Sequence, residues 1–285
     1  MTIPGAVRAV AAVAVLLGLA ACAEKGAAGS PDDPAPSAAQ PAATEGLVLR
    51  VEQTGGLAPP TMLRPQLPIV SVYADGRTIT QGPVPAIYPG PALPNLQVAE
   101  IGPDAVQDLV DRALAAGVAE TSDLGDPPVA DAFSTRFTVV TTEQTYVREV
   151  YALWEAPDDG GLTDDQRAAR EQLTDLLATL TDQAIATVPY EPEAVAAVAT
   201  PWVDPRDGLV QPEQRWPGPD LSGGATGDPF GGTCVTATGA DARALLEAAG
   251  TANAATPWLT GDGMRWSVTF RPLLPDETDC ADLEG

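Results

Sequence analysis

Tight turns between short β-branched runs constrain the fold of this chain more than any other sequence feature. Asp75-Gly76 and Asp262-Gly263 are dipeptides that favour two-residue hairpin turns, and alternating apolar residues flank both of them. A third pair of β-branched and aromatic runs surrounds Thr142–Gln144. We therefore expect three antiparallel hairpins. They span residues 68–80, 135–154 and 261–272.

Two further features of the sheets follow from the same alternation. Leu47–Gly55 alternates apolar and polar residues and is expected to be a strand. Counting outward from a two-residue turn in the first hairpin places Val72 opposite Ile79. Tyr73 then faces Thr78 on the other side of the sheet.

Three stretches carry apolar residues at helical spacing and are expected to be helices. The second stretch begins with Thr163 and Gln166 in a capping-box pattern, and its apolar stripe continues to Val188. The third begins with Thr238 and Asp241 in the equivalent positions. The three helices span residues 103–117, 163–188 and 238–250.

Strands and helices do not alternate along this chain as they do in a doubly wound sheet, so we expect the α+β class. Antiparallel hairpins would then pack with about three helices. Residues 98–109 and 235–246 share Gly, Asp, Ala and Leu at matching positions, which suggests two similar lobes. The alternative is that strand–helix junctions reuse Gly and Asp because helix caps favour them.

The amino-terminal residues indicate export. An apolar run of about 13 residues, Ala9–Ala21, follows the single charge of Arg8. It is shorter than the roughly 20 residues that span a membrane, and small residues end it, as in a secretory signal.

The sequence Leu19-Ala20-Ala21-Cys22 resembles the lipobox of bacterial lipoproteins. The resemblance implies a diacylglyceryl group on the Cys22 thiol, cleavage before Cys22, and acylation of the new amino terminus by a chain such as palmitate. The alternative is an ordinary secretory signal that contains a cysteine.

Composition then divides the chain into four expected parts. Residues 1–21 are the signal peptide, and residues 22–46 are a lipidated stalk that is rich in Pro, Ser and Gly. No apolar residue larger than Ala occurs between Ala23 and Gly46, so this segment is expected to be disordered. Residues 47–156 form an N-terminal α+β lobe, and residues 157–285 form a C-terminal α+β lobe with a disulfide.

The net charge excludes one class of partner. Removal of residues 1–21 leaves 39 acidic and 14 basic residues, a formal charge of −25. Nucleic-acid binding requires a basic face, so no nucleic-acid partner is expected. Repulsion from an anionic leaflet also leaves the lipid on Cys22 as the expected membrane attachment.

The two remaining cysteines, Cys234 and Cys280, are expected to form a disulfide. An exported chain sits where disulfides persist, and two leftover cysteines most simply pair. The alternative is a reactive thiol, which needs an activating base or a nearby partner in a CxxC motif. Neither is visible in the sequence.

The residue types present exclude several catalytic mechanisms. The chain has no histidine, and its one lysine, Lys25, lies in the stalk. Catalysis by Ser-His-Asp or Cys-His is therefore excluded, as are His-ligated zinc and Walker-type phosphate loops. Chemistry with paired carboxylates survives, because it needs only Asp or Glu. No catalytic residue is singled out.

An acidic cluster suggests calcium but does not match the EF-hand pattern. It consists of Asp158, Asp159, Asp164 and Asp165. The last two acids suit the first turn of a helix, where the dipole favours negative charge. We therefore expect no metal and no cofactor.

Two tryptophans are candidate ligand contacts. Trp202 and Trp216 lie in a Pro-rich segment, and exposed together they would stack on a sugar or a peptide. The alternative is that they pin a long loop to the core.

Two segments, Val72–Ile79 and Phe270–Cys280, are similar to parts of uncharacterised secreted lipoproteins from high-GC Gram-positive bacteria. That group implies no activity. We expect a non-enzymatic, lipid-anchored protein on the extracytoplasmic face of the cell membrane that binds or scaffolds an envelope protein or glycan. The alternatives are a carboxylate-dependent hydrolase of envelope sugars and the solute-binding subunit of a transporter. The oligomeric state stays open.

Overall fold

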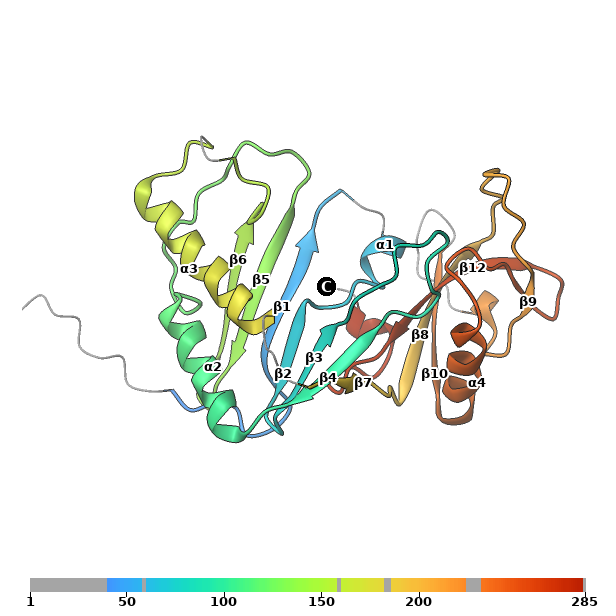
Figure 1. The fold of residues 1–285 in the computed structure, drawn as a ribbon, viewed down its shortest axis with the longest axis horizontal. Coiled ribbons are helices and arrows are strands. Elements are labelled where there is room, and N and C mark those ends of the chain that lie inside the picture. Colours follow the sequence, from blue (N-terminus) through green and yellow to red (C-terminus); the bar gives the residue numbers. More distant parts are fainter. Residues whose placement is uncertain (1–39, 58–59, 158–159, 182–185, 224–231, 284–285) are drawn as a thin grey trace, which may run out of the picture. The chain divides into compact units, whose positions relative to one another are not determined.

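A seven-stranded antiparallel sheet holds the amino-terminal part of the fold (Figure 1). The computed structural model describes residues 40–57, 60–157, 160–181, 186–223 and 232–283. The strands of this sheet are β1 (Leu47–Gly55), β2 (Val70–Tyr73), β3 (Arg77–Gln81), β4 (Leu96–Glu100), β5 (Phe133–Val140), β6 (Thr145–Tyr151) and β7 (Val188–Pro189). Their order is β6-β5-β1-β2-β3-β4-β7.

A five-stranded sheet holds the later residues. Its strands are β8 (Ala194–Pro201), β9 (Gln214–Arg215), β10 (Thr233–Thr238), β11 (Trp258–Leu259) and β12 (Arg265–Pro272). Their order is β10-β8-β12-β11-β9, and every pair is antiparallel except β11 with β9. The helices of the described chain are α1 (Pro60–Leu63), α2 (Pro103–Ala115), α3 (Asp164–Thr181) and α4 (Gly239–Gly250), with the 3-10 turns η1 (Leu221–Gly223) and η2 (Cys280–Leu283). The expected α+β class is confirmed.

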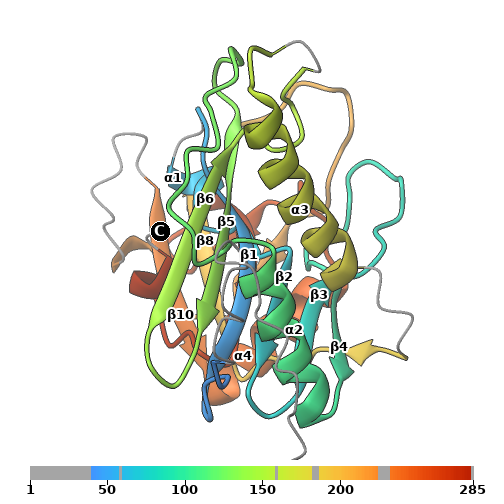
Figure 2. The ribbon, with the colours of Figure 1, turned by 90° about the vertical axis from the view of Figure 1, so that its left-hand side faces the viewer.

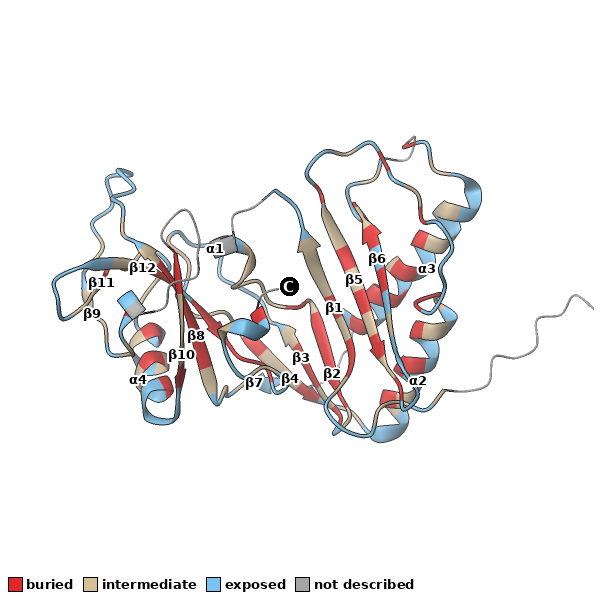
Figure 3. Ribbon diagram, turned by 180° about the vertical axis from the view of Figure 1, so that it is seen from behind, coloured by how far each residue is buried: buried red, intermediate tan, exposed pale blue. Residues whose placement is uncertain are grey.

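Helices cover one face of each sheet. Figure 2 shows α2 and α3 in front of the seven-stranded sheet, where their leucine and valine stripes join the largest buried cluster. Buried and partly exposed residues alternate along β5, as a strand covered mainly on one face requires (Figure 3). In the five-stranded sheet, Leu245 of α4 packs in one cluster with Trp258 and Phe270.

The other face of the seven-stranded sheet contacts the end of the chain. Tyr73, Ile79 and Leu96 form a buried cluster with Leu274, which follows β12. The hydroxyl of Tyr190, just after β7, donates a hydrogen bond of 2.8 Å to the carbonyl oxygen of Leu273. We call residues 273–283 the C-terminal tail.

The three predicted hairpins are present, as β2–β3, β5–β6 and β11–β12. The predicted two-residue turn of the third, at Asp262-Gly263, is wrong, because Leu259 pairs with Arg265 across a five-residue connection, 260–264. The predicted register of the first is wrong by one residue, because Val72 pairs with Thr78 and Ser71 with Ile79. The connection has three residues, 74–76, and not two. Gly76 has a φ of +89°, and a Cβ there would lie 2.1 Å from the carbonyl oxygen of Ile101. A three-residue turn with Gly in the left-handed region gives this shifted register.

The capping box of α3 is confirmed. The amide of Thr163 donates to Oε1 of Gln166 at 2.9 Å, and the amide of Gln166 donates to Oγ1 of Thr163 at 3.2 Å. The predicted extension of this helix to Val188 is wrong, because Val188 pairs with Val98 in the sheet. Val188 precedes a proline, which disfavours helical geometry at that position.

The predicted capping box of α4 is wrong. Thr238 is the N-cap residue, but its side chain makes no capping hydrogen bond. The next residue, Gly239, has a φ of +56°, outside the helical region that a capping box requires at the first helical position.

Part of the expected stalk belongs to the fold. Residues 40–46, expected to be the end of the stalk, contact the fold. The hydroxyl of Tyr146 donates to Oε1 of Gln40 at 2.6 Å, and the amide of Ala42 donates to Oε1 of Gln107 at 2.9 Å. Ala42 also forms an isolated antiparallel bridge with Thr141, beside the turn between β5 and β6.

The two-lobe expectation is not confirmed. The helix α3 follows the expected boundary at 156/157, yet its leucines pack on the seven-stranded sheet. The strand β7 also lies beyond that boundary and joins the same sheet. The chain therefore passes from one sheet to the other between β7 and β8. The boundary does not separate two similar halves.

The predicted pairing of Cys234 with Cys280 is confirmed. The two sulfur atoms are 2.03 Å apart, and the Cα atoms are 6.0 Å apart. The bond joins β10 to η2 and so attaches the end of the C-terminal tail to the five-stranded sheet. Among the described residues, no helix is both long and apolar enough to cross a membrane.

Candidate functional site

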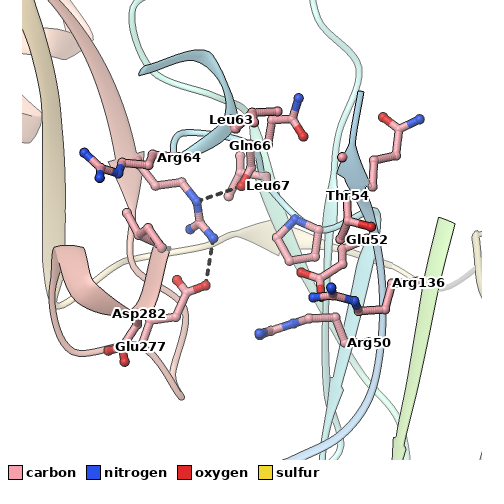
Figure 4. A pocket seen from close by; sticks show the side chains of 15 residues that line it. Arg50, Glu52, Thr54, Leu63, Arg64, Gln66, Leu67, Arg136, Glu277 and Asp282 are labelled. Carbon is pink, nitrogen blue, oxygen red and sulfur yellow. Dashed lines mark hydrogen bonds and ion pairs between the residues drawn. The ribbon is translucent and has the colours of Figure 1, made fainter. Parts of the chain in front are cut away.

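A cavity of about 330 Å³ lies between the seven-stranded sheet and the C-terminal tail. One wall comes from β1 and β5, and others come from the segment between α1 and β2, from β12 and from the tail (Figure 4). Seven of the lining residues are charged: Arg50, Glu52, Arg64, Arg136, Arg271, Glu277 and Asp282. Pockets of a few hundred Å³ with a small number of convergent polar groups are the usual form of ligand sites.

Strand alternation places the charged groups of the sheet wall. Arg50, Glu52 and Thr54 follow one another at every second position of β1, so their side chains point to the same face. Glu52 pairs with Arg136 of β5. This face lies opposite α2 and α3, which pack against the alternate residue Val51.

Arg50 is held at the base of this wall by the strand beside it and by the tail. Its Nε donates to Oγ of Ser71 at 3.1 Å, and its Nη2 donates to Oδ1 of Asp276 at 2.8 Å. Burial lowers the pKa of Arg50, but the charge of Asp276, the hydrogen bond to it and the nearby Tyr73 and Glu277 together raise the pKa above its ordinary value. The guanidinium therefore stays charged although little of it is exposed.

Tyr73 completes this contact between sheet and tail. Its hydroxyl donates to the same Oδ1 of Asp276 at 2.8 Å. Burial and the negative charge of Asp276 raise the pKa of Tyr73 far above its ordinary value. The phenol stays protonated and acts as a donor, not as a base.

A buried ion pair forms the tail side of the cavity. Nη2 of Arg271 lies 2.7 Å from Oε1 of Glu277, and the two side chains are 2% and 6% exposed. Nε of Arg271 donates to the carbonyl oxygen of Gln66 at 3.2 Å, and Oε2 of Glu277 accepts from the amide of Leu274 at 2.7 Å. Burial lowers the pKa of Arg271, and Glu277 offsets part of that effect. The pair fixes β12, the tail and the segment before β2 together.

Asp282 of η2 stands at the rim. Its Oδ2 accepts hydrogen bonds from the amide and hydroxyl of Thr278, at 2.7 and 2.8 Å. These bonds lower the pKa of Asp282, so it is ionised at neutral pH. Asp220 and Asp262 also have lowered pKa values, because hydroxyl and amide groups bond to them. A carboxyl group that acts as a general acid at neutral pH needs a raised pKa.

The predicted site residues lie elsewhere. Cys22 falls outside the described residues. Trp216 packs with Trp258 and Phe270, at ring-centroid distances of 5.7 and 6.3 Å, and its Nε1 donates to the carbonyl oxygen of Pro219 at 2.6 Å. Its environment matches the alternative of a loop pinned to the core.

Trp202 lies apart from Trp216. The guanidinium of Arg265 lies over its ring at 5.8 Å. Trp202 directly follows β8 and Trp216 directly follows β9, with β12 and β11 between those two strands. Neither tryptophan lines the cavity described above.

The acidic cluster is only partly visible. Asp158 and Asp159 lie outside the described residues, and Asp164 and Asp165 occupy the first turn of α3, as expected. In the described part of the chain, no group of three or more Cys, Asp or Glu side chains is placed to hold a metal ion.

The arginines of the cavity were missed by the sequence analysis. Alternation along residues 265–272 places Arg271 on the face opposite Phe270, but it does not show what covers that face. A usable signal was present: charged residues recur on the non-core face of β1, β5 and β12, although the chain holds only 15 basic residues. Comparison of the chain with protein-family models, with curated proteins and with solved structures found no match.

Proposed function

We propose that this protein is a lipid-anchored binding protein on the extracytoplasmic face of the cell membrane, and that its ligand occupies the arginine-lined cavity. One observation carries the proposal. Four arginines and three acids line the cavity, whereas the whole chain has 15 basic and 39 acidic residues. Such a concentration of the rarer charge in a concave site is typical of a binding function.

The rigidity of the walls supports the same proposal. The sheet wall belongs to β1 and β5, and the tail wall is fixed by the Arg271–Glu277 ion pair and by the disulfide at Cys280. Side chains held on paired strands are positioned more accurately than side chains on loops. A preformed site loses less entropy when a ligand binds.

The anchor is supported by the sequence and by the disulfide. Disulfides persist in exported proteins, which fits the lipobox at Cys22. The residues that the structure describes begin at Gln40, and 17 residues separate Gln40 from Cys22 in the sequence.

The anchor has a simple test. Replacement Cys22→Ser removes the thiol that would receive the lipid, so we expect unprocessed precursor or protein released to the medium. The intact mass of the wild-type membrane form should include acyl chains. A membrane form whose mass equals that of the polypeptide alone would rule out the anchor.

The binding site is tested with protein purified from the envelope in mild detergent. Native mass spectrometry should show a bound small molecule on the wild type. Thr54→Trp fills the cavity from β1 and should remove it. Val147→Trp is the matched control, because Val147 is 55% exposed on β6 of the same sheet and does not line the cavity.

The outcome separates two locations. Loss of the ligand from Thr54→Trp, with retention by Val147→Trp, supports the cavity as the site. Equal retention by both variants, or a wild type that carries no ligand even after incubation with envelope extract, contradicts the proposal.

A further inference from the structure

The hydrogen bonds of Arg50 leave one end of its guanidinium without a partner among the described residues. Nε and Nη2 bond to Ser71, Tyr73 and Asp276. Nη1 makes no hydrogen bond to any other described residue. Because Arg50 lines the cavity, this terminal donor is available to a ligand bound there.

Arg136 offers a second donor group beside it. Its Nε donates to Oε1 of Glu149 at 2.6 Å, but its Nη1 is 3.7 Å from Oε1 of Glu52, too far for a hydrogen bond. Among the described residues, neither Nη atom of Arg136 has a hydrogen-bond acceptor. Its side chain is 31% exposed and so can exchange water for a ligand.

Strand register brings the two donor groups together. Arg50 lies opposite Thr138 and Arg136 lies opposite Glu52, so the arginines are diagonal neighbours across β1 and β5. Such neighbours are about 7–8 Å apart. Figure 4 shows both side chains extending in the same direction from the sheet wall, with Glu277 and Asp282 on the far side.

We propose that Arg50 and Arg136 form an oxyanion clamp, and that the ligand of the cavity is bound through a phosphate or carboxylate group. The inference rests on the proposed function and names the chemical class of its ligand. A guanidinium binds the oxygens of carboxylate and phosphate through charged hydrogen bonds, which a neutral ligand cannot match. Arg136 can offer both Nη atoms to such a group, and Arg50 can add Nη1. The rest of the strongly acidic chain repels anions, so an anionic ligand should bind at the clamp and not elsewhere on the surface.

Glu52 tunes the clamp. Its carboxylate lies beside Arg136 and is 28% exposed. An incoming oxyanion meets repulsion from Glu52 and competes with it for Arg136. Removal of this one charge should therefore strengthen binding, an effect that a purely structural ion-pair cluster does not produce.

The test is a titration of the full mature protein in detergent micelles, followed by NMR. The Nε–H signal of Arg50 and the amides of β1 report on the clamp. Three probes present the oxyanion in different molecules: inorganic phosphate as the free ion, acetate as a carboxylate, and glycerol 3-phosphate as the headgroup fragment of a phospholipid. The probe with the highest affinity identifies the source of the group.

Three variants accompany the wild type. Arg136→Gln should weaken binding by about tenfold, the value of one charged hydrogen bond. Glu52→Gln should strengthen it severalfold. Arg77→Gln is the matched control and should not change it, because Arg77 is an exposed arginine on β3 that pairs with Asp75 outside the cavity.

The inference is overturned if no probe binds the wild type saturably, or if Arg136→Gln and Arg77→Gln bind equally well. A second outcome contradicts the clamp but not the proposed function: Thr54→Trp loses the envelope ligand and Arg136→Gln keeps it. The ligand then binds in the cavity without the clamp. If Thr54→Trp keeps the ligand, the proposed function itself fails.

Discussion

At the scale of single residues, the Arg271–Glu277 pair combines deep burial with a role in shaping the cavity. Both charges are almost fully removed from water, and each is held by a further hydrogen bond to the backbone. A buried pair of this kind is not a strong source of net stability, but the loss of one partner leaves the other uncompensated.

Replacement Glu277→Ala should therefore destabilise the fold by about 3–5 kcal/mol, because Arg271 would keep its charge in a buried site. Urea denaturation measures the change in the free energy of unfolding. The control is Asp164→Ala, which breaks the exposed pair with Arg167 and should cost less than about 1 kcal/mol. Similar losses in both variants would contradict the burial argument.

The raised pKa of Tyr190 predicts how the stability of the fold changes at alkaline pH. Burial raises the pKa of Tyr190 to about 12 in the folded state, from an ordinary value of 10.0. Between these two values the folded state holds a proton that the unfolded state releases. The contribution of this group to stability is complete below pH 10 and is lost as the pH rises to about 12.

The measurement is urea unfolding at several pH values from 9 upward. The raised pKa of Tyr73 acts in the same direction, so the wild type should lose stability steadily above pH 10. Tyr190→Phe should lose less over that range, because it has no phenol to ionise. Parallel curves for the two proteins would show that Tyr190 does not contribute.

At the scale of elements, the two helix starts differ in a way that mutation can detect. Thr163 caps α3 with its hydroxyl, whereas the side chain of Thr238 makes no capping bond at α4. Thr163→Ala should therefore cost about 1 kcal/mol of stability. Thr238→Ala should cost less. An equal loss in both, measured by urea unfolding, would contradict the observed cap geometry.

The disulfide is the other element-scale prediction. Cys280→Ser should cost about 2–5 kcal/mol, the usual range for a native disulfide in a secreted domain. The C-terminal tail should then loosen, because η2 loses its link to β10. Limited proteolysis with mass spectrometry of the fragments should show new cleavage within residues 273–283. A tail equally resistant in both proteins would contradict this role.

Most elements were predictable, because their signals are local. The hairpin of β11 and β12, the capping box at Thr163 and the stripe of α2 each depend on residues that are close in sequence. The register around Gly76 was not predictable, since the close approach of Ile101 comes from a distant segment.

The candidate site was out of reach for the same reason. Arg50 and Asp276 meet across 226 positions of the chain, and Arg271 reaches Gln66 across 205. Alternation along one strand shows which side chains share a face. It does not show that strands from two sheets, together with a tail, enclose that face.

At the scale of the whole molecule, the cavity, the tail and the proposed anchor together support a binding function at the envelope. The chain carries a large negative charge, yet it gathers four arginines on the walls of one cavity. The disulfide and the Arg271–Glu277 pair hold the tail that closes the cavity. The proposed lipid at Cys22 would keep this site at the envelope, where its ligand is expected.

The most direct test of this account is an experimental structure of the mature protein with its ligand, purified from the envelope without a denaturing step. The account predicts density for a small molecule in the cavity, with oxygen atoms within hydrogen-bond distance of Nη1 of Arg50 and of an Nη atom of Arg136. A ligand bound at another place, or one that lies in the cavity with no oxygen near either guanidinium, would contradict it.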